Sequence, residues 1–478
     1  MSLLASLVSS ASALSVFDRA VATIQNNVSN ASTVDYASQS LTLDALPFDP
    51  AAGLLGGVRA GEMVSTRNEL AETAVQRQQT AFGTFDQKTT SLNAVQGALD
   101  LSSASGIPAT LGNLFQSFSA WSLSPASSIS RQAVIDNAHT VAVSFNTAAT
   151  KLERAGQDND QQILQTVDQI NADGAKLRDY NIERRSGNRT DAGLDAKIHS
   201  TLEDLSLLVG FTSTIEPDGT ATVLLGGQTP LVIGTNEYSI ASQFAVPAGA
   251  AAASAPGPPS AVINDSAGRD ITAQITGGHL GALLDIHNNV LASLLGDSSQ
   301  PGRLNQMAQA FADRVNQILT AGSISDGPPP VPGIPLFSYD TSNATRVAAT
   351  LAVDPAATQD QLAAIDPGPP YVSNGTALNL VALDNPQDAA DEINNLSYAQ
   401  FYGNVAAGVG RELANATDQR DIQQQLVTQA QSVREQISGV SLDQQAVLLL
   451  DFQRVYQANA KFVTVLDELT QTAVGLIK

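Results

Sequence analysis

The last forty residues carry the clearest pattern of apolar and polar positions in the chain. Between Gly439 and Lys478, apolar side chains form two columns that each repeat every seven residues. One column is Leu448, Val455, Phe462, Leu469 and Leu476, and the other is Leu442, Leu449, Tyr456, Val463, Thr470 and Ile477. A strict seven-residue repeat keeps one side of a helix facing a partner helix along its whole length. The pattern therefore predicts a long helix that pairs with another helix, with a capping box at Ser441 and Gln444.

The first 31 residues carry a matching pattern. One column there is Leu7, Leu14, Val21 and Val28, and the second is Leu3, Phe17, Ile24 and Ala31, with Ser10 as its one gap. No basic residue precedes the apolar run, and Asp18 and Arg19 interrupt it, so we expect neither a cleaved signal peptide nor a membrane span. We predict that the two ends pair with each other and with neighbouring copies. The C-terminal helix should be loose when alone and should order on a complementary surface.

Between the ends the chain is mainly helical. Apolar residues at spacings of three and four predict a helical bundle from residues 46–208, 276–325 and 385–437, in which separate helices span 131–155 and 160–180. The period changes to two after Gly210, which predicts short strands around the Pro217-Asp218-Gly219 turn. Residues 243–262, rich in proline and alanine, are expected to form an exposed, mobile loop. We assign residues 209–275 and 326–384 to a β-rich outer domain, and 1–45 with 438–478 to a terminal coiled-coil domain.

Composition limits the functions that this chain can have. Lys and Arg number 24 against 46 Asp and Glu, a net charge of −22, which disfavours binding to nucleic acid or to an anionic membrane. The absence of cysteine excludes disulfides and thiolate chemistry. His279 and His287 flank Asp285, but two helical turns separate them by about 12 Å, too far to share one ion. We predict no catalytic residues, no metal site and no cofactor.

Particular residues resemble a known family. The first helix runs into Asn26, Asn27, Asn30, Thr33 and Tyr36, and the last carries Ser441-Leu442-Asp443-Gln444-Gln445-Ala446, Phe452-Gln453, Tyr456-Gln457-Ala458 and Asp467-Glu468-Leu469. Both segments resemble the axial proteins of the bacterial flagellum. The succession Phe118, Trp121, Pro125 and Arg131, and the segment Gly278-His279-Leu280-Gly281 with Leu283-Leu284, resemble the hook-associated members. Val34-Asp35 stand where that family usually has Pro-Gly, and Ser38 where Arg is common.

The resemblance implies a function and a set of partners. It implies a structural adaptor between hook and filament that polymerises through its terminal helices, exported to the cell exterior by the flagellar secretion system. Hook protein, a second hook-filament junction protein and a flagellar export chaperone are the implied partners, together with neighbouring copies. The alternatives are another axial component, such as hook or distal rod protein, an enzyme carried at residues 209–275, and a coiled-coil adhesin.

The candidate site is an assembly interface at the two chain ends. We expect it to contain Leu7, Leu14, Phe17, Val21, Ile24, Asn27, Val28, Asn30, Leu449, Phe452, Tyr456, Val463, Leu466 and Leu469.

Overall fold

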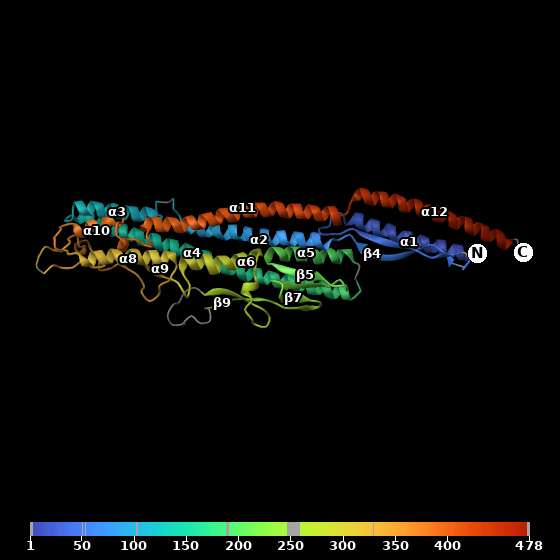
Figure 1. The fold of residues 1–478 in the computed structure, drawn as a ribbon, viewed down its shortest axis with the longest axis horizontal. Helices are drawn as coiled ribbons and strands as arrows, with labels where there is room; N and C mark the ends of the chain where they lie inside the picture. The colour runs from blue at the N-terminus through green and yellow to red at the C-terminus, as the bar shows by residue number, and fades with distance from the viewer. Residues whose placement is uncertain are drawn as a thin grey trace.

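A computed structural model gives the fold, and it describes residues 3–49, 51–52, 54–101, 104–187, 191–245, 259–327 and 329–475. The protein is elongated, and both chain ends lie at the same end of the molecule (Figure 1). The helices in the described part are α1 Leu3–Ser29, α2 Glu69–Ala98, α3 Ile107–Leu123, α4 Ser128–Arg185, α5 Ala192–Leu208, α6 Gly278–Asp285, α7 Ala292–Leu295, α8 Arg303–Ala321, α9 Val347–Thr350, α10 Gly375–Ala382, α11 Tyr398–Ser438 and α12 Leu442–Gly475. Short 3-10 helices lie at Thr272–Gln274, Gln359–Gln361 and Ala389–Asp391, and a π-helix at Ile286–Leu291.

The strands form small antiparallel sheets. Their bounds are β1 Gln39–Ala45, β2 Phe48–Asp49, β3 Leu54–Leu55, β4 Val58–Ser65, β5 Phe211–Ile215, β6 Ala221–Leu225, β7 Thr229–Ile233, β8 Asn236–Glu237, β9 Ala241–Ala245, β10 Ser260–Asn264, β11 Phe337–Ser338 and β12 Ala352–Val353. Only β5–β8 form a sheet of four strands in the described part, and the other strands pair in twos. The mainly helical fold predicted from the sequence is confirmed.

Helix α4 is continuous where two helices were expected. Its 58 residues span about 87 Å at 1.5 Å per residue. The prediction of separate helices at 131–155 and 160–180 was wrong, because the polar stretch between them stays helical. Within it, the buried Asn159 donates its side-chain N–H to the carbonyl of Leu283 at 3.1 Å. A tertiary hydrogen bond thus gives the side-chain N–H of this buried residue a partner, in a stretch where the sequence pattern suggests a break.

The part of the molecule farthest from the chain ends has a core built on aromatic rings. Phe311 on α8 lies between Phe115, Phe337 and Tyr398, with ring centroids 6.2, 5.7 and 5.2 Å away. Trp121 is also fully buried. Its indole N–H and the Arg131 guanidinium both donate to the carbonyl of Pro125, which fixes the turn between α3 and α4.

A second core joins the four-stranded sheet to α4, α5 and α6. The carboxamide of Asn181 on α4 donates to the carbonyls of Ala221 and Gly234 and accepts the N–H of Ala221, which ties the sheet to the helix. The predicted turn is present, with Gly219 at φ 82°. Of the expected mobile loop, residues 246–258 lie outside the described part, while β9 and β10 pair on either side of them.

The two stretches assigned to one outer domain pack on different cores. Residues of 209–275 belong to the core formed with α5 and α6, whereas those of 326–384 belong to the aromatic core. The reason is the path of the chain, since α8 separates the two stretches. The domain boundaries themselves stay a prediction.

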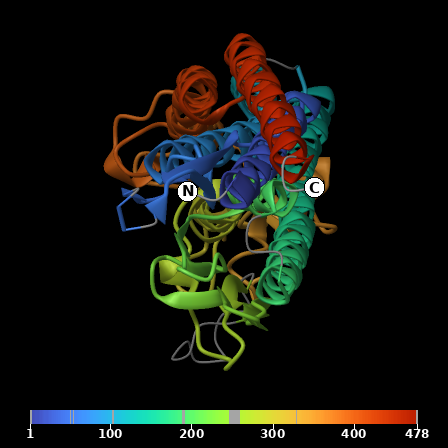
Figure 2. The same ribbon diagram turned by 90° about the vertical axis from the view of Figure 1, so that its right-hand side faces the viewer.

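The terminal part is a helix pair with a β-hairpin. Helix α1 packs against α12 and also against the hairpin of β1 and β4, whose tip is β2 and β3. Figure 2, which looks onto this end, places the hairpin and α12 on different sides of α1. By length and composition, Ser6–Ser29 could cross a membrane, with mean hydropathy 1.3, and a third of it is buried in the protein.

The aromatic core gives the first prediction. Replacing Phe311 with Ala should lower the free energy of unfolding by roughly 3–5 kcal/mol, because the fully buried ring loses its contacts and leaves a cavity. Leu123→Ala, at a side chain that is 83% exposed, should change it by less than about 0.5 kcal/mol. Chemical denaturation of both variants measures the difference, and equal effects would contradict the assigned core.

Candidate assembly site at the chain ends

The candidate interface residues lie along the contact of α1 and α12, but not all face it. Phe17 and Phe452 meet across the pair, with ring centroids 6.2 Å apart. Of the expected residues, Phe17, Ile24, Asn27 and Leu466 are buried, Leu7, Leu14, Val21, Asn30, Leu449, Phe452 and Val463 are half-buried, and Val28, Tyr456 and Leu469 are exposed. Phe17 with Phe452, and Asn27 with Gln445, thus mark the seam between the two helices within one chain, and the other buried and half-buried residues are covered by this seam or by the neighbouring hairpin. Their role between copies stays a prediction.

Asn27 fixes the position of α12, α1 and the hairpin relative to one another. Its side-chain N–H groups donate to Gln445 Oε1 at 3.1 Å and to the carbonyl of Gln39 at 2.8 Å. Its oxygen accepts from the Tyr36 hydroxyl and from the backbone N–H of Gln39, each at 3.0 Å. The side chain is 1% exposed, so every polar atom is satisfied without water. This residue therefore acts inside the chain.

A second face of α12 is apolar and exposed. We call it the outer stripe: Leu448, Val455, Phe462 and Leu469, which are 43, 40, 52 and 51% exposed. These residues are one of the two seven-residue columns seen in the sequence, while the second column contributes Leu449 and Val463 to the seam. Of these residues, only Leu469 was among the expected interface residues. Leu448, Val455 and Phe462 were not, although they belong to the same seven-residue repeat. Complete burial stabilises such side chains by roughly 1.5–3 kcal/mol each, and this chain leaves much of that unrealised.

A joint of three chain segments connects the terminal part to the helical body. The carbonyl of Ser438 accepts from the backbone N–H of Ser38 at 2.8 Å and from the Thr66 hydroxyl at 2.9 Å. The Ser438 hydroxyl accepts from the backbone N–H of Asn68 at 3.2 Å. Beyond the joint, Ser441 caps α12 by accepting the backbone N–H of Gln444 at 3.4 Å, which is one of the two bonds of the predicted capping box.

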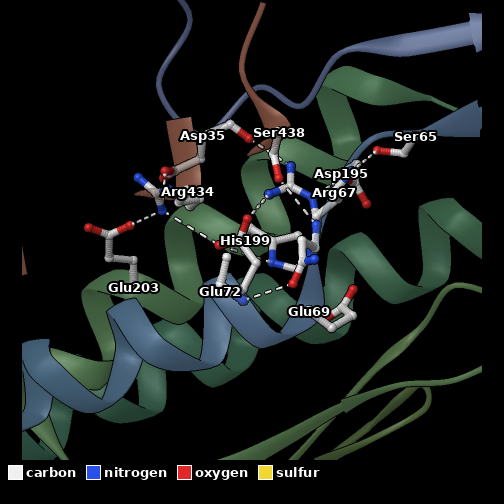
Figure 3. Close-up of polar contacts among 12 residues, drawn as sticks. Asp35, Ser65, Arg67, Glu69, Glu72, Asp195, His199, Glu203, Arg434 and Ser438 are labelled. Atoms are coloured by element: carbon white, nitrogen blue, oxygen red, sulfur yellow. Dashed lines mark hydrogen bonds and ion pairs between the residues drawn. The ribbon is translucent and has the colours of Figure 1, made fainter. Parts of the chain in front are cut away.

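A buried cluster of charges lies under this joint (Figure 3). Arg67 donates to Asp195 at 2.6 Å, to Glu72 at 2.5 Å and to the carbonyl of Asp35 at 2.6 Å. Arg434 pairs with Asp35 at 2.8 Å and with Glu203 at 2.5 Å. The cluster draws on α2, α5 and α11 and on the loop after α1. Removing one member would leave others buried and unpaired, which is strongly destabilising.

Asp35 occupies a left-handed backbone conformation. Its φ is 58°, a region that favours glycine and that Asn and Asp enter more readily than most residues. This is the position where the resembled family usually has glycine. Here an aspartate adopts this conformation, and its buried carboxylate is held by Arg434.

The cluster shifts the pKa values of its members. Burial raises the pKa of Asp35 to about 6, against the lowering effect of Arg434, and the carboxylates of Glu203 and Glu72 add to the rise. Burial, with the positive charge of Arg67, lowers the pKa of His199 to about 3, so this imidazole is neutral near pH 7. Burial alone would raise the pKa of Asp195, yet Arg67 and other neighbours lower it.

The described residues of the site form a structural joint beside a cavity, and they contain no cluster of metal ligands. A cavity of about 390 Å³ lies beside the joint, lined by residues 31–37 and by Arg67, Glu72, Arg434, Glu435 and 438–440. No group of three or more His, Asp or Glu side chains in the described residues could hold a metal ion. His287 instead pairs with Asp160 at 2.7 Å and contacts the carbonyl of Pro259, so it links α4 to the strand β10.

Comparisons with known proteins agree over most of the chain. Residues 92–337 match the model of the flagellar hook-associated protein FlgK helical domain, and 429–476 match that of the flagellar basal body rod FlgEFG protein C-terminal. The chain is 23% identical over 500 residues to flagellar hook-associated protein 1 of Bacillus subtilis, covering 97% of this chain and 96% of that protein. The flagellar hook junction protein FlgK of Burkholderia pseudomallei has a similar fold, with a TM-score of 0.64 at 15% identity, covering 76% of this chain and 100% of the other.

The raised pKa of Asp35 gives the second prediction. A folded-state pKa above the unfolded value favours the protonated folded chain, so this contribution is full below about pH 4 and is lost as the pH rises through 6. Asp35→Asn keeps the backbone preference and removes the titration. The variant should therefore gain stability relative to the parent chain as the pH rises from 4 to 7.

Denaturation of both chains at each pH measures this gain. The parent chain must be measured beside the variant because His199 gives stability the opposite dependence on pH. The lowered pKa of His199 makes the stability of both chains fall as the pH drops below about 6.5. If Asp35→Asn loses stability relative to the parent as the pH rises, the pairing with Arg434 outweighs burial.

Proposed function

Since the chain belongs to the flagellar hook-associated protein FlgK family, we propose that it is a structural subunit that joins hook to filament through its paired terminal helices. It is located in the bacterial flagellum and assembles with other flagellar components. The family is structural, and the charge cluster has a structural explanation in the joint that it supports. The outer stripe of α12 is the single observation that carries the proposed mode of assembly.

The outer stripe supports a mode of assembly in which copies complete each other's surfaces. A helix pair can bury one face of each helix, and α12 has apolar residues on two. Contacts that join different surfaces of identical subunits propagate in rings or helical arrays. In this proposal the terminal helices line the inside of a tubular junction, and the helical body stacks outward.

The remaining partners are those that the family resemblance implies. Hook protein on one side and the second junction protein on the other would bind the subunits of this junction. A flagellar export chaperone would cover the C-terminal helix before export, since a helix with an exposed apolar face requires protection from aggregation. Export through the flagellar secretion system, without a cleaved signal peptide, completes the proposal.

A second candidate is another axial component, such as hook or distal rod protein. The match of residues 429–476 to the rod-protein C-terminal model is the observation that supports this candidate. The match of 92–337 to the hook-associated helical domain favours the junction, since it covers about half of the chain. Loss of filaments with intact hooks, in cells that lack this chain, would distinguish the junction from the rod and hook.

The third prediction tests the outer stripe. Phe462→Asp should leave the fold of the isolated subunit intact, with less than about 0.5 kcal/mol change in the free energy of unfolding, because the side chain is 52% exposed. It should abolish filament attachment, since a charge in an assembled apolar contact is unpaired. Electron microscopy of hooks and filaments measures attachment.

Leu164→Asp is the matched control. This side chain on α4 is 46% exposed and lies outside the terminal helices, so filaments should remain attached. Normal filaments on Phe462→Asp cells would exclude the outer stripe from assembly.

A further inference from the structure

The tip of the β1–β4 hairpin is a second exposed apolar surface at the end of the molecule that holds the termini. We call it the hairpin tip: Leu46, Phe48 and Leu54, which are 38, 68 and 46% exposed. The Phe48 ring lies over Gly56, at φ 66°, where a Cβ atom would come within 3.0 Å of the ring. A glycine in the tight turn thus supports an aromatic side chain that presents its other face outward.

The hairpin is fixed along α1. Asn27 bonds to Gln39 at the base of the hairpin, the Thr23 hydroxyl contacts the sulfur of Met63 at 3.6 Å, and the Ser9 hydroxyl donates to the carbonyl of Gly56 at 3.3 Å near the tip. The tip therefore has a defined position beside Ser9 and is presented to other molecules in a fixed place.

The hairpin tip and Phe462 of the outer stripe lie at about the same position along the axis of the helix pair. Asn27 meets Gln445, and the helices run antiparallel, since Phe17 meets Phe452 farther along. From Asn27 to Ser9 is about 27 Å along α1, and from Gln445 to Phe462 is about 26 Å along α12. The hairpin and α12 lie on different sides of α1 (Figure 2). One chain cannot join the two surfaces, but a neighbour beside it can do so with little axial shift.

The charges beside the two surfaces are complementary. Asp49 follows Phe48 at the tip, and Lys461 precedes Phe462 on the outer stripe, with Arg454 one heptad earlier in the same column. Among the described residues no ion pair engages Arg454 or Lys461, in a chain of net charge −22. Asp49 likewise has no cationic partner there, and its carboxylate accepts from the backbone of Ala51 and Ala52.

We propose that the hairpin tip of one copy packs on the outer stripe of the neighbouring copy, with Phe48 against Phe462 and Asp49 beside Lys461. The two patches differ and face different directions, as a contact that propagates around a ring requires. This inference rests on the proposed function and adds the surface of the neighbour that covers α12.

Cross-linking tests the contact directly, because the chain has no cysteine of its own. Flagella are isolated from cells that make both a Phe48→Cys chain and a Phe462→Cys chain and are treated with a short bismaleimide. The contact predicts a covalent dimer joining positions 48 and 462, identified by mass spectrometry, in at least about tenfold excess over flagella made from either variant alone. A mixture of Phe48→Cys and Leu164→Cys chains, with a thiol of comparable exposure on α4, should give no dimer.

Charge reversal is the second measurement. Asp49→Lys or Lys461→Asp alone should reduce incorporation of the subunit into flagella by about tenfold, and the double variant should recover most of that loss. Asp49 also caps its own turn, so Asp49→Lys can fail to fold. In that case the cross-linking result alone tests the contact. A product with hook protein or the second junction protein in place of the 48–462 dimer overturns this inference. So does absence of the dimer when the subunit is present at the junction, a result that leaves the proposed function standing. Absence of the unmodified subunit from the junction overturns both.

Discussion

A helix that packs against a single partner can bury only one of its faces, and α12 has apolar residues on two. Its seam with α1 is closed by Phe17, Phe452 and Leu466, while the column from Leu448 to Leu469 stays open to solvent. The free energy of burying the second column is available only through another molecule. We propose that this unfilled contact connects the architecture to the family's role, because burying it against another molecule would favour assembly.

The terminal part can transmit this contact only if it is held firmly to the body. Three chain segments cross the joint, and the buried charges of Arg67, Arg434 and their carboxylate partners fix their relative positions. Such a cluster is a weak source of net stability, since each charge loses its hydration, but it disfavours arrangements that leave a charge unpaired. Asp35, with its left-handed backbone, belongs to the same charge cluster, because its carboxylate contacts Arg434 and its carbonyl contacts Arg67. We infer that the cluster sets the angle at which the terminal helices leave the body.

The periodic features of this fold could be predicted from the sequence, whereas the features that depend on residues far apart in the chain could not. The seven-residue columns predicted both terminal helices. Which column faces α1 depends on packing, so the outer stripe could not be separated from the seam by spacing alone. In the continuous α4, the polar stretch that suggested a break contains Asn159, which bonds to Leu283, a partner more than a hundred positions away. The charge cluster, likewise, joins residues from 35 to 434, and no local pattern marks it.

Hydrogen exchange of α12 is the measurement that tests this account most directly. In the isolated subunit, the backbone amides of α12 should exchange much faster than those of α4 and α11, because α12 packs on one helix only. In assembled flagella the same amides should become protected by at least about a hundredfold, as a neighbour covers the outer stripe. Equal protection of α12 in the isolated and the assembled subunit would show that its surface is already complete, and would contradict the account.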